Sequence, residues 1–183
     1  MSEPVSPGQV IVLTGPPGAG KSTVSRLLAD ELSPSVHLHT DDFYKFIRRG
    51  AIAPYLPEAQ RQNEIVIDVL AGAAFGYAVG GYDVVVDGVI GPWFLDVFRK
   101  AGAGFKTHYV VLRPNEAITI GRAVDRGPEA LTAVAPIREL YRQFSELGEL
   151  ERHVMDSGPM DADATTTAVL AGIARGAYLL AGD

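Results

Sequence analysis

The stretch Gly15-Pro-Pro-Gly-Ala-Gly-Lys-Ser22 decides how the rest of the chain is interpreted. Its glycines let the backbone approach a phosphate closely, and a lysine and a hydroxyl residue follow them. An apolar run over residues 9–13 precedes the stretch and an amphipathic segment over residues 23–32 follows it, so we expect it to join a strand to a helix. Successive N–H groups and the positive end of that helix would then face an anion. The pattern therefore predicts a phosphate-binding loop.

Two side chains of this loop have a chemical role of their own. Lys21 is expected to reach the β- and γ-phosphates of a nucleotide and to take part in catalysis. Ser22 offers a hydroxyl to Mg²⁺, a hard cation that is otherwise held by phosphate oxygens and water. We therefore expect ATP, which the loop does not distinguish from GTP, together with Mg²⁺. The expected nucleotide contacts are Gly15, Pro16, Pro17, Gly18, Ala19, Gly20, Lys21, Ser22 and Thr23.

Composition favours one soluble domain over residues 1–183, with 47% hydrophobic and 21% charged residues. A net charge of -6 would repel a polyanion, and the basic pair Arg48-Arg49 is too short to override it, so no nucleic-acid partner is expected. The absence of cysteine excludes disulfides and thiolate metal sites and fits a reducing compartment. No apolar run reaches the roughly 18 residues that span a bilayer. We expect a cytoplasmic monomer or homodimer without a membrane partner.

Strand and helix patterns alternate along the chain, which predicts an α/β fold. Parallel strands need helical crossovers, so we expect three layers: a central parallel sheet of about five strands flanked by helices, with a small lid. Ligands of such sheets bind beyond the carboxyl ends of the strands. The predicted strands cover residues 9–14, 36–39, 82–86, 106–112 and 153–155, and the predicted helices cover residues 23–32, 58–79, 93–101, 115–124, 137–147 and 161–180, with a further helix beginning at Phe43.

Two acidic residues follow the second predicted strand. Asp41 comes just past the strand end, where a carboxylate can accept a hydrogen bond from an acceptor hydroxyl, so we expect it to be the catalytic base. Aspartate is also a favoured helix N-cap, and either Asp41 or Asp42 could instead cap the helix beginning at Phe43. For Asp42 the choice between a catalytic role and a cap stays open.

A third acid, Asp87, ends the apolar strand Val84-Val-Val86. An acid at this place can hold Mg²⁺ directly or through water, which makes Asp87 a predicted metal ligand beside Ser22. The alternative is a turn residue that precedes Gly88.

Two arginines, Arg122 and Arg126, lie four residues apart on one face of a predicted helix. Guanidinium groups on a closing segment would stabilise phosphate charge and exclude water, so both are predicted to be catalytic and Arg122 to bind nucleotide. We therefore interpret about residues 123–138 as a lid, with residues 127–136 as a small-residue linker and Arg138 as a weaker candidate. The alternative is a solvated helix face paired with Asp125 or Glu129.

Aromatic residues cluster after the second and third strands. Trp93 follows Asp87 closely enough to form a wall of an acceptor pocket. Core packing is expected for most of these rings, and no role is assigned to the histidines, whose spacing does not suit a metal site. The aromatic residues concerned are Phe43, Tyr44, Phe46, Tyr55, Trp93 and Phe94, and the histidines are His37, His39, His108 and His153.

Over nearly its whole length the chain resembles the small P-loop kinases, a group that includes gluconate, shikimate and chloramphenicol kinases. The resemblance rests on residues 15–22, Thr40-Asp-Asp-Phe-Tyr44, Val84-Val-Val-Asp-Gly88 and the pair Arg122/Arg126. It implies that Asp41 acts as base, that Asp87 contacts substrate or Mg²⁺, and that the two arginines embrace the phosphates. It also implies that the loop over residues 156–159, including Ser157, borders the adenine.

The resemblance implies an ATP-dependent kinase that phosphorylates a hydroxyl of a metabolite, a nucleoside-like molecule or an antibiotic. Asp42-Phe43-Tyr44 also looks like the nucleoside and pantothenate kinase pattern, and an obvious shikimate-type arginine set is missing, so the acceptor stays open. A non-catalytic nucleotide-dependent switch is the main alternative. A polynucleotide 5′-hydroxyl kinase is a further one, which the acidic composition argues against.

Overall fold

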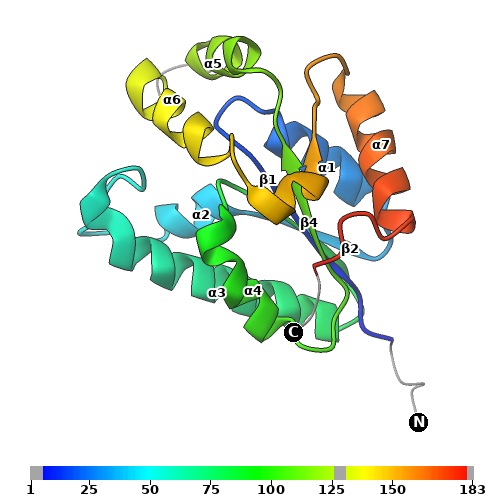
Figure 1. Ribbon diagram of the computed structural model, residues 1–183. Helices are drawn as coiled ribbons and strands as arrows, with labels where there is room; N and C mark the ends of the chain where they lie inside the picture. The colour runs from blue at the N-terminus through cyan, green and yellow to red at the C-terminus, as the bar shows by residue number, and fades with distance from the viewer. Residues whose placement is uncertain (1–5, 126–130, 181–183) are drawn as a thin grey trace.

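The computed structural model describes residues 6–125 and 131–180 and contains a five-stranded, fully parallel sheet. The strand order is β2-β3-β1-β4-β5, so the first strand lies at the centre (Figure 1). This confirms the predicted α/β fold with a parallel sheet of five strands. The strands are β1 Val10–Thr14, β2 Ser35–His39, β3 Asp83–Asp87, β4 Thr107–Leu112 and β5 Val154–Met155.

Helices cover both faces of the sheet and form the outer two layers. Helices α3 and α4 lie below the sheet in the view of Figure 1, whereas α1 and α7 pack on its other face. Three further helices, α2, α5 and α6, lie toward the carboxyl ends of the strands. The bounds are α1 Lys21–Asp30, α2 Thr40–Lys45, α3 Gln60–Val79, α4 Leu95–Ala101, α5 Glu116–Val124, α6 Val134–Gln143 and α7 Ala162–Ala174, and the 3₁₀ turns are η1 Pro57–Ala59, η2 Pro92–Phe94 and η3 Gly148–His153.

The central strand β1 is buried on both faces, as its unbroken apolar run predicts. Val10 and Val12 pack into the core between the sheet and helices α3 and α4, while Ile11 and Leu13 pack against α1 and α7. This alternation follows from the two-residue period of a strand. The loop that leaves β1 is therefore anchored at the centre of the sheet.

Four predicted helix boundaries are wrong by three residues or more, one of them the end of α6, which lies at Gln143 and not at Leu147. Helix α2 begins at Thr40, directly after β2 and not at Phe43. Helix α6 begins at Val134 inside the predicted linker, because Pro136 falls in the first turn, where no intrahelical N–H bond is needed. Helix α7 ends at Ala174, and Gly176, with φ of 70°, reverses the chain after it. The following residues run along β4, where the Leu180 N–H donates to the Thr107 carbonyl over 2.9 Å.

Within the two described ranges, no helix is long and apolar enough to cross a lipid bilayer.

An ion pair fastens the end of β4 to the segment between α6 and β5. The two terminal nitrogens of Arg113 donate to the two carboxylate oxygens of Glu151 over 2.9 and 2.8 Å. Arg113 also donates to the Phe144 carbonyl, and Glu151 accepts from the Leu147 N–H. A bidentate guanidinium–carboxylate pair is among the stronger ion pairs, so this contact stabilises the position of the α6–β5 segment beside the end of β4.

We expect Glu151→Gln to unfold at a lower urea concentration than the wild type at neutral pH. Hydrogen bonds from Arg113 and the Leu147 N–H lower the pKa of Glu151 from 4.5 to about 2. A lowered pKa stabilises the fold above about 4.5, and that stabilisation is lost as the pH falls through about 2. The gap between the two unfolding midpoints should therefore close over this interval. A gap that stays constant would contradict the contact, and Glu149→Gln in the same turn is the control.

Candidate functional site

The phosphate-binding loop lies between β1 and α1, as predicted, and Lys21 is the first residue of the helix. The Lys21 side chain is 5% exposed, and its Nζ donates to the Pro16 carbonyl over 3.0 Å. This bond folds the side chain back across the loop. Gly15 has φ of 140°, and a Cβ there would lie 2.1 Å from the Leu112 carbonyl oxygen. Only glycine at this position therefore allows the backbone of the loop to pass so close to the end of β4.

Gly18 sets the distance between this loop and helix α5. It has φ of 89°, and a Cβ there would lie 2.1 Å from the Thr119 carbonyl oxygen and 3.1 Å from the Ala123 Cβ. Helix α5 therefore packs directly on the loop, which brings Arg122 next to it. Among the described residues Arg122 has no ion-pair partner, so the predicted alternative pairing with Asp125 is not seen. Arg126 and Glu129 lie outside the described residues.

Gly18→Ala is expected to weaken ATP binding by about tenfold or more, because the methyl group would push α5 and Arg122 away from the loop. Gly121→Ala is the matched control in the same helix, since its Cβ would meet nothing within 4 Å. That variant should bind ATP normally and gain about 0.5–1 kcal/mol of stability from better helix propensity. Titration with a fluorescent ATP analogue measures both. Equal affinities for the two variants would contradict the packing role of Gly18.

A cavity of about 310 Å³ opens beside the loop and gathers three separate groups of predicted nucleotide-binding residues. Arg122 comes from α5, and Ser157 comes from the loop after β5. Ser157 is 3% exposed, and its hydroxyl has no hydrogen-bond partner among the described residues, so it is available to a ligand. The cavity is lined by Gly18, Ala19, Gly20, Thr23, Val24, Arg122, Ser157, Met160, Asp161, Ala162 and Thr165.

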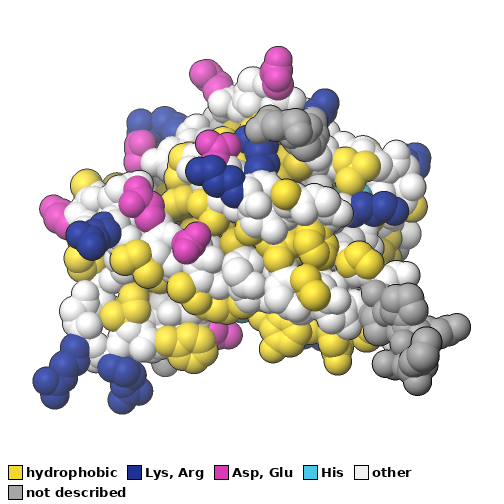
Figure 2. Space-filling model, turned by 90° about the horizontal axis from the view of Figure 1, so that it is seen from below, with side chains coloured by type: hydrophobic (Ala, Val, Ile, Leu, Met, Phe, Trp, Pro, Cys, Tyr) yellow, Lys and Arg dark blue, Asp and Glu magenta, His cyan; other side chains and the backbone are white. Residues whose placement is uncertain are grey.

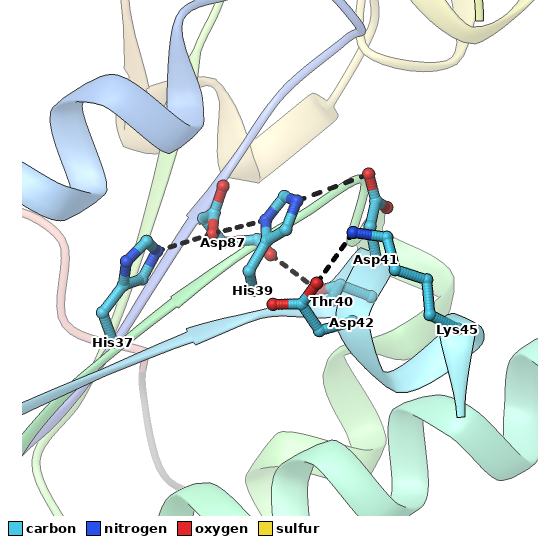
Figure 3. A network of polar contacts seen from close by, with 7 residues as sticks. All are labelled: His37, His39, Thr40, Asp41, Asp42, Lys45 and Asp87. Atoms are coloured by element: carbon cyan, nitrogen blue, oxygen red, sulfur yellow. Dashed lines mark hydrogen bonds and ion pairs between the residues drawn. The ribbon is translucent and has the colours of Figure 1, made fainter. Parts of the chain in front are cut away.

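Asp87 ends β3 and is fully buried. Its Oδ1 accepts hydrogen bonds from His37 Nε2 over 2.8 Å and from His39 Nδ1 over 2.9 Å, and its backbone carbonyl accepts from the Thr40 hydroxyl (Figure 3). Burial by itself raises the pKa of Asp87, but the hydrogen bonds from His37 and His39, together with the nearby Ser22 hydroxyl, outweigh burial, so the pKa is lowered. Asp87 is therefore a buried, ionised carboxylate with the Ser22 hydroxyl beside it.

The geometry around Asp87 fits Mg²⁺. Its Oδ2 is buried and has no hydrogen-bond partner among the described residues, so one oxygen remains for a ligand. A carboxylate and a hydroxyl suit a hard cation that takes most of its ligands from phosphate and water. In the part of the chain that the structure describes, no group of three or more His, Cys, Asp or Glu side chains is arranged to hold a metal ion. A metal here would therefore depend on the nucleotide.

Asp41 lies in the first turn of α2, and its side chain is 70% exposed. Its Oδ2 lies 3.4 Å from Nε2 of His39, the imidazole that also binds Asp87. The contact with His39 lowers the pKa of Asp41, and the charge of Lys21 lowers it further. Hydrogen bonds to Asp41 and Asp87 raise the pKa of His39 to about 10. The Asp41 carboxylate is therefore ionised and faces solvent, within range of the charge of Lys21.

The capping interpretation of Asp41 and Asp42 is wrong. The N-cap of α2 is His39, and both aspartates lie in the first turn, where the helix dipole favours negative charge. Asp42 instead pairs with Lys45, its Oδ1 accepting from the lysine Nζ over 2.9 Å in an exposed contact (Figure 3).

No role was predicted for His37 and His39, although both contact Asp87. They are two residues apart on β2, and both therefore point to the same face of the sheet. The strand register sets His39 directly opposite Asp87 and His37 one diagonal position away. The alternation Val36-His-Leu-His39 shows that the histidines share a face, but their partner lies on another strand.

Core packing, expected for most of the aromatic rings, is found for Phe94 and partly for Phe43 but not for most of the six. Phe94 is buried, whereas Phe46, Tyr55 and Trp93 are 72%, 46% and 48% exposed. Trp93 packs against Phe94 and Phe144 and leaves part of its ring at the surface.

A cavity of about 600 Å³ lies between α2, the segment after it and α3, and no predicted site residue lines it. Figure 2 shows the underside of the molecule, on the α3 and α4 side, where hydrophobic side chains form patches among charged ones.

Comparisons with known proteins show the family and the fold of the chain. A family model described as an AAA domain matches residues 11–139. A protein of Thermococcus kodakarensis, provisionally named an adenylate kinase, is 34% identical over 119 residues, 64% of this chain and 56% of its own. A shikimate kinase of Pseudomonas aeruginosa is 37% identical over 87 residues, 43% and 48% of the two chains. The chain thus spans about half the length of these relatives. A gluconokinase structure from Sinorhizobium meliloti aligns with a TM-score of 0.70, 20% identity and 94% coverage of both chains, which shows the shared fold.

Proposed function

Because the chain belongs to the AAA domain family and has the fold of the small P-loop kinases, we propose that it is an ATP-dependent phosphotransferase acting on a hydroxyl group of a small molecule. The acceptor would be a metabolite, a nucleoside-like compound or an antibiotic. The chain would work as a single kinase domain in which the 310 Å³ cavity takes the nucleoside of ATP.

One observation carries this proposal. Lys21 follows β1 and Asp41 follows β2 at the carboxyl edge of one parallel sheet, and His39 links Asp41 to Asp87 on β3, the strand between them. Phosphoryl transfer needs a cation that contacts the phosphates. It also needs a group in front of the γ-phosphate that accepts a hydrogen bond from the substrate hydroxyl. Lys21, after β1, and Asp41, after β2, would supply these two groups from the same edge of the sheet.

The chain's own residues would do the following. Lys21, the loop N–H groups and Arg122 would bind the phosphate oxygens, and Asp41 would orient the acceptor hydroxyl. Mg²⁺ beside Ser22 and Asp87 would supply neutralisation of phosphate charge. The bond between the γ-phosphorus and the bridging oxygen of ADP breaks as the acceptor oxygen bonds to phosphorus. The hydroxyl proton passes to Asp41, whose lowered pKa suits orientation of the hydroxyl more than early proton removal.

A panel of hydroxyl acceptors, incubated with ATP and Mg²⁺ and scored for ADP release, tests the proposal. Sugars, sugar acids, nucleosides, hydroxylated antibiotics and a 5′-hydroxyl oligonucleotide should be included. At least one small-molecule class should raise ADP release about tenfold above the no-acceptor background. A response to the oligonucleotide alone would favour a polynucleotide kinase. Tight ATP binding with ADP release that no acceptor changes would favour a nucleotide-dependent switch.

A further inference from the structure

Two imidazoles share one oxygen of the Asp87 carboxylate. His37 Nε2 and His39 Nδ1 both contact Oδ1, over 2.8 and 2.9 Å, and Figure 3 shows them approaching it from β2. The other oxygen, Oδ2, is buried and has no partner among the described residues. One carboxylate oxygen of Asp87 therefore accepts two hydrogen bonds, whereas the other accepts none from the described residues.

We propose that His37 and His39 are positioning residues that hold Oδ1 of Asp87 so that Oδ2 is presented to the metal ion of the nucleotide complex. The inference rests on the proposed function, because it takes Asp87 as a metal ligand. It adds two residues that never touch substrate or metal and that act through Asp87.

Fixing one carboxylate oxygen constrains the other. A carboxylate rotates about its Cβ–Cγ bond, and one hydrogen bond leaves some of that rotation free. Two donors on a single oxygen, both from a strand that is hydrogen-bonded to β3, remove much of it. Outer-shell hydrogen bonds of this kind orient ligating carboxylates and are worth about 10–100-fold in metal affinity or activity.

The position of Asp87 in the sheet makes this orientation useful. Asp87 is the register partner of Leu13 on β1, two residues before the phosphate-binding loop begins. The Ser22 hydroxyl is near enough to help lower the pKa of Asp87. An oxygen presented from this carboxylate therefore lies beside the second predicted metal ligand.

A purely structural role is the competing explanation. Burying an ionised carboxylate is costly unless hydrogen bonds compensate it, and the two histidines supply such bonds. That role would affect folding stability but would leave metal affinity unchanged. The two explanations therefore differ in what metal binding does when the donors are removed.

The test measures Mn²⁺ binding in the presence of ADP by electron paramagnetic resonance of the free ion, with urea unfolding in parallel. Asp87→Asn should weaken Mn²⁺ binding, which checks the metal ligand itself. His37→Ala and His39→Ala should each weaken it about tenfold. His37→Gln and His39→Asn keep an N–H donor at the positions of Nε2 and Nδ1, so both should bind Mn²⁺ within about twofold of the wild type. The amide variants His37→Asn and His39→Gln place their N–H donor at the wrong position, so they should weaken Mn²⁺ binding as the alanine variants do. If the alanine variants fail to fold, these amide variants provide the same comparison.

Different outcomes overturn different statements. If the alanine and mismatched variants bind Mn²⁺ like the wild type while Asp87→Asn does not, the histidines have a structural role only. The positioning proposal then fails, and Asp87 remains the proposed metal ligand. If His39→Asn binds as weakly as His39→Ala, the charge of the imidazole matters and positioning is wrong. If Asp87→Asn binds Mn²⁺ normally, Asp87 is not the metal ligand, and the metal assignment fails together with this inference.

Discussion

Asp41→Asn is expected to lower the rate of phosphoryl transfer to an acceptor hydroxyl by about a hundredfold or more, while ATP affinity changes less than about twofold. Asparagine keeps the size of the side chain but removes the charge that accepts the hydroxyl proton, and general-base contributions typically amount to 10²–10⁴-fold. The side chain is 70% exposed and lies in a first helical turn, so the fold should tolerate the change. Acceptor-dependent ADP release and titration with a fluorescent ATP analogue measure the two quantities.

Asp42→Asn is the matched control for this experiment. Asp42 is the next residue of the same helical turn, and its carboxylate pairs with Lys45 at the surface. Exposed pairs of this kind contribute little, so this variant should keep wild-type transfer. Retained transfer in Asp41→Asn, or an equal loss in both variants, would remove Asp41 as the base.

Lys21→Met is expected to lower phosphoryl transfer by about a thousandfold. Methionine keeps most of the aliphatic stem but removes the ammonium group that stabilises charge on the transferring phosphoryl group. Preorganised groups of this kind are each worth about 10²–10³-fold or more. ATP affinity should fall less, because the loop N–H groups still face the phosphates. Single-turnover transfer with enzyme in excess separates the chemical step from binding.

Lys45→Met controls for the loss of a positive charge near the site. Lys45 lies in α2 with a side chain that is 71% exposed. Its substitution should leave single-turnover transfer within about twofold of the wild type, as expected for a surface charge. If Lys21→Met transferred phosphoryl groups at the wild-type rate, the loop would bind an anion without catalysing its transfer.

Local patterns were sufficient to predict much of the fold. The phosphate-binding loop follows from glycine spacing, and the strand before it follows from an apolar run too continuous for a half-exposed strand. The placement of Asp87 at the end of β3 follows from the same kind of run. Because parallel strands end at one edge, these local patterns also predicted that Lys21, Asp41 and Asp87 would lie close together.

Features that depend on contacts between distant segments were not predicted, and several local helix boundaries were predicted wrongly. His37 and His39 face Asp87 only through the register between β2 and β3, which no local pattern encodes. The start of α2 was placed three residues late, because aspartates suit both an N-cap and a first turn. Gly18 was predicted to approach a phosphate, whereas its packing against Thr119 depends on how α5 lies on the loop.

The most direct test of the central claim is mass spectrometry of a small-molecule extract incubated with ATP, Mg²⁺ and the protein. The account predicts that one compound, or a few chemically related hydroxyl compounds, gains a single phosphoryl group with the wild-type protein and not with Asp41→Asn. Consumption of ATP that yields inorganic phosphate alone, with no phosphorylated compound, would contradict it.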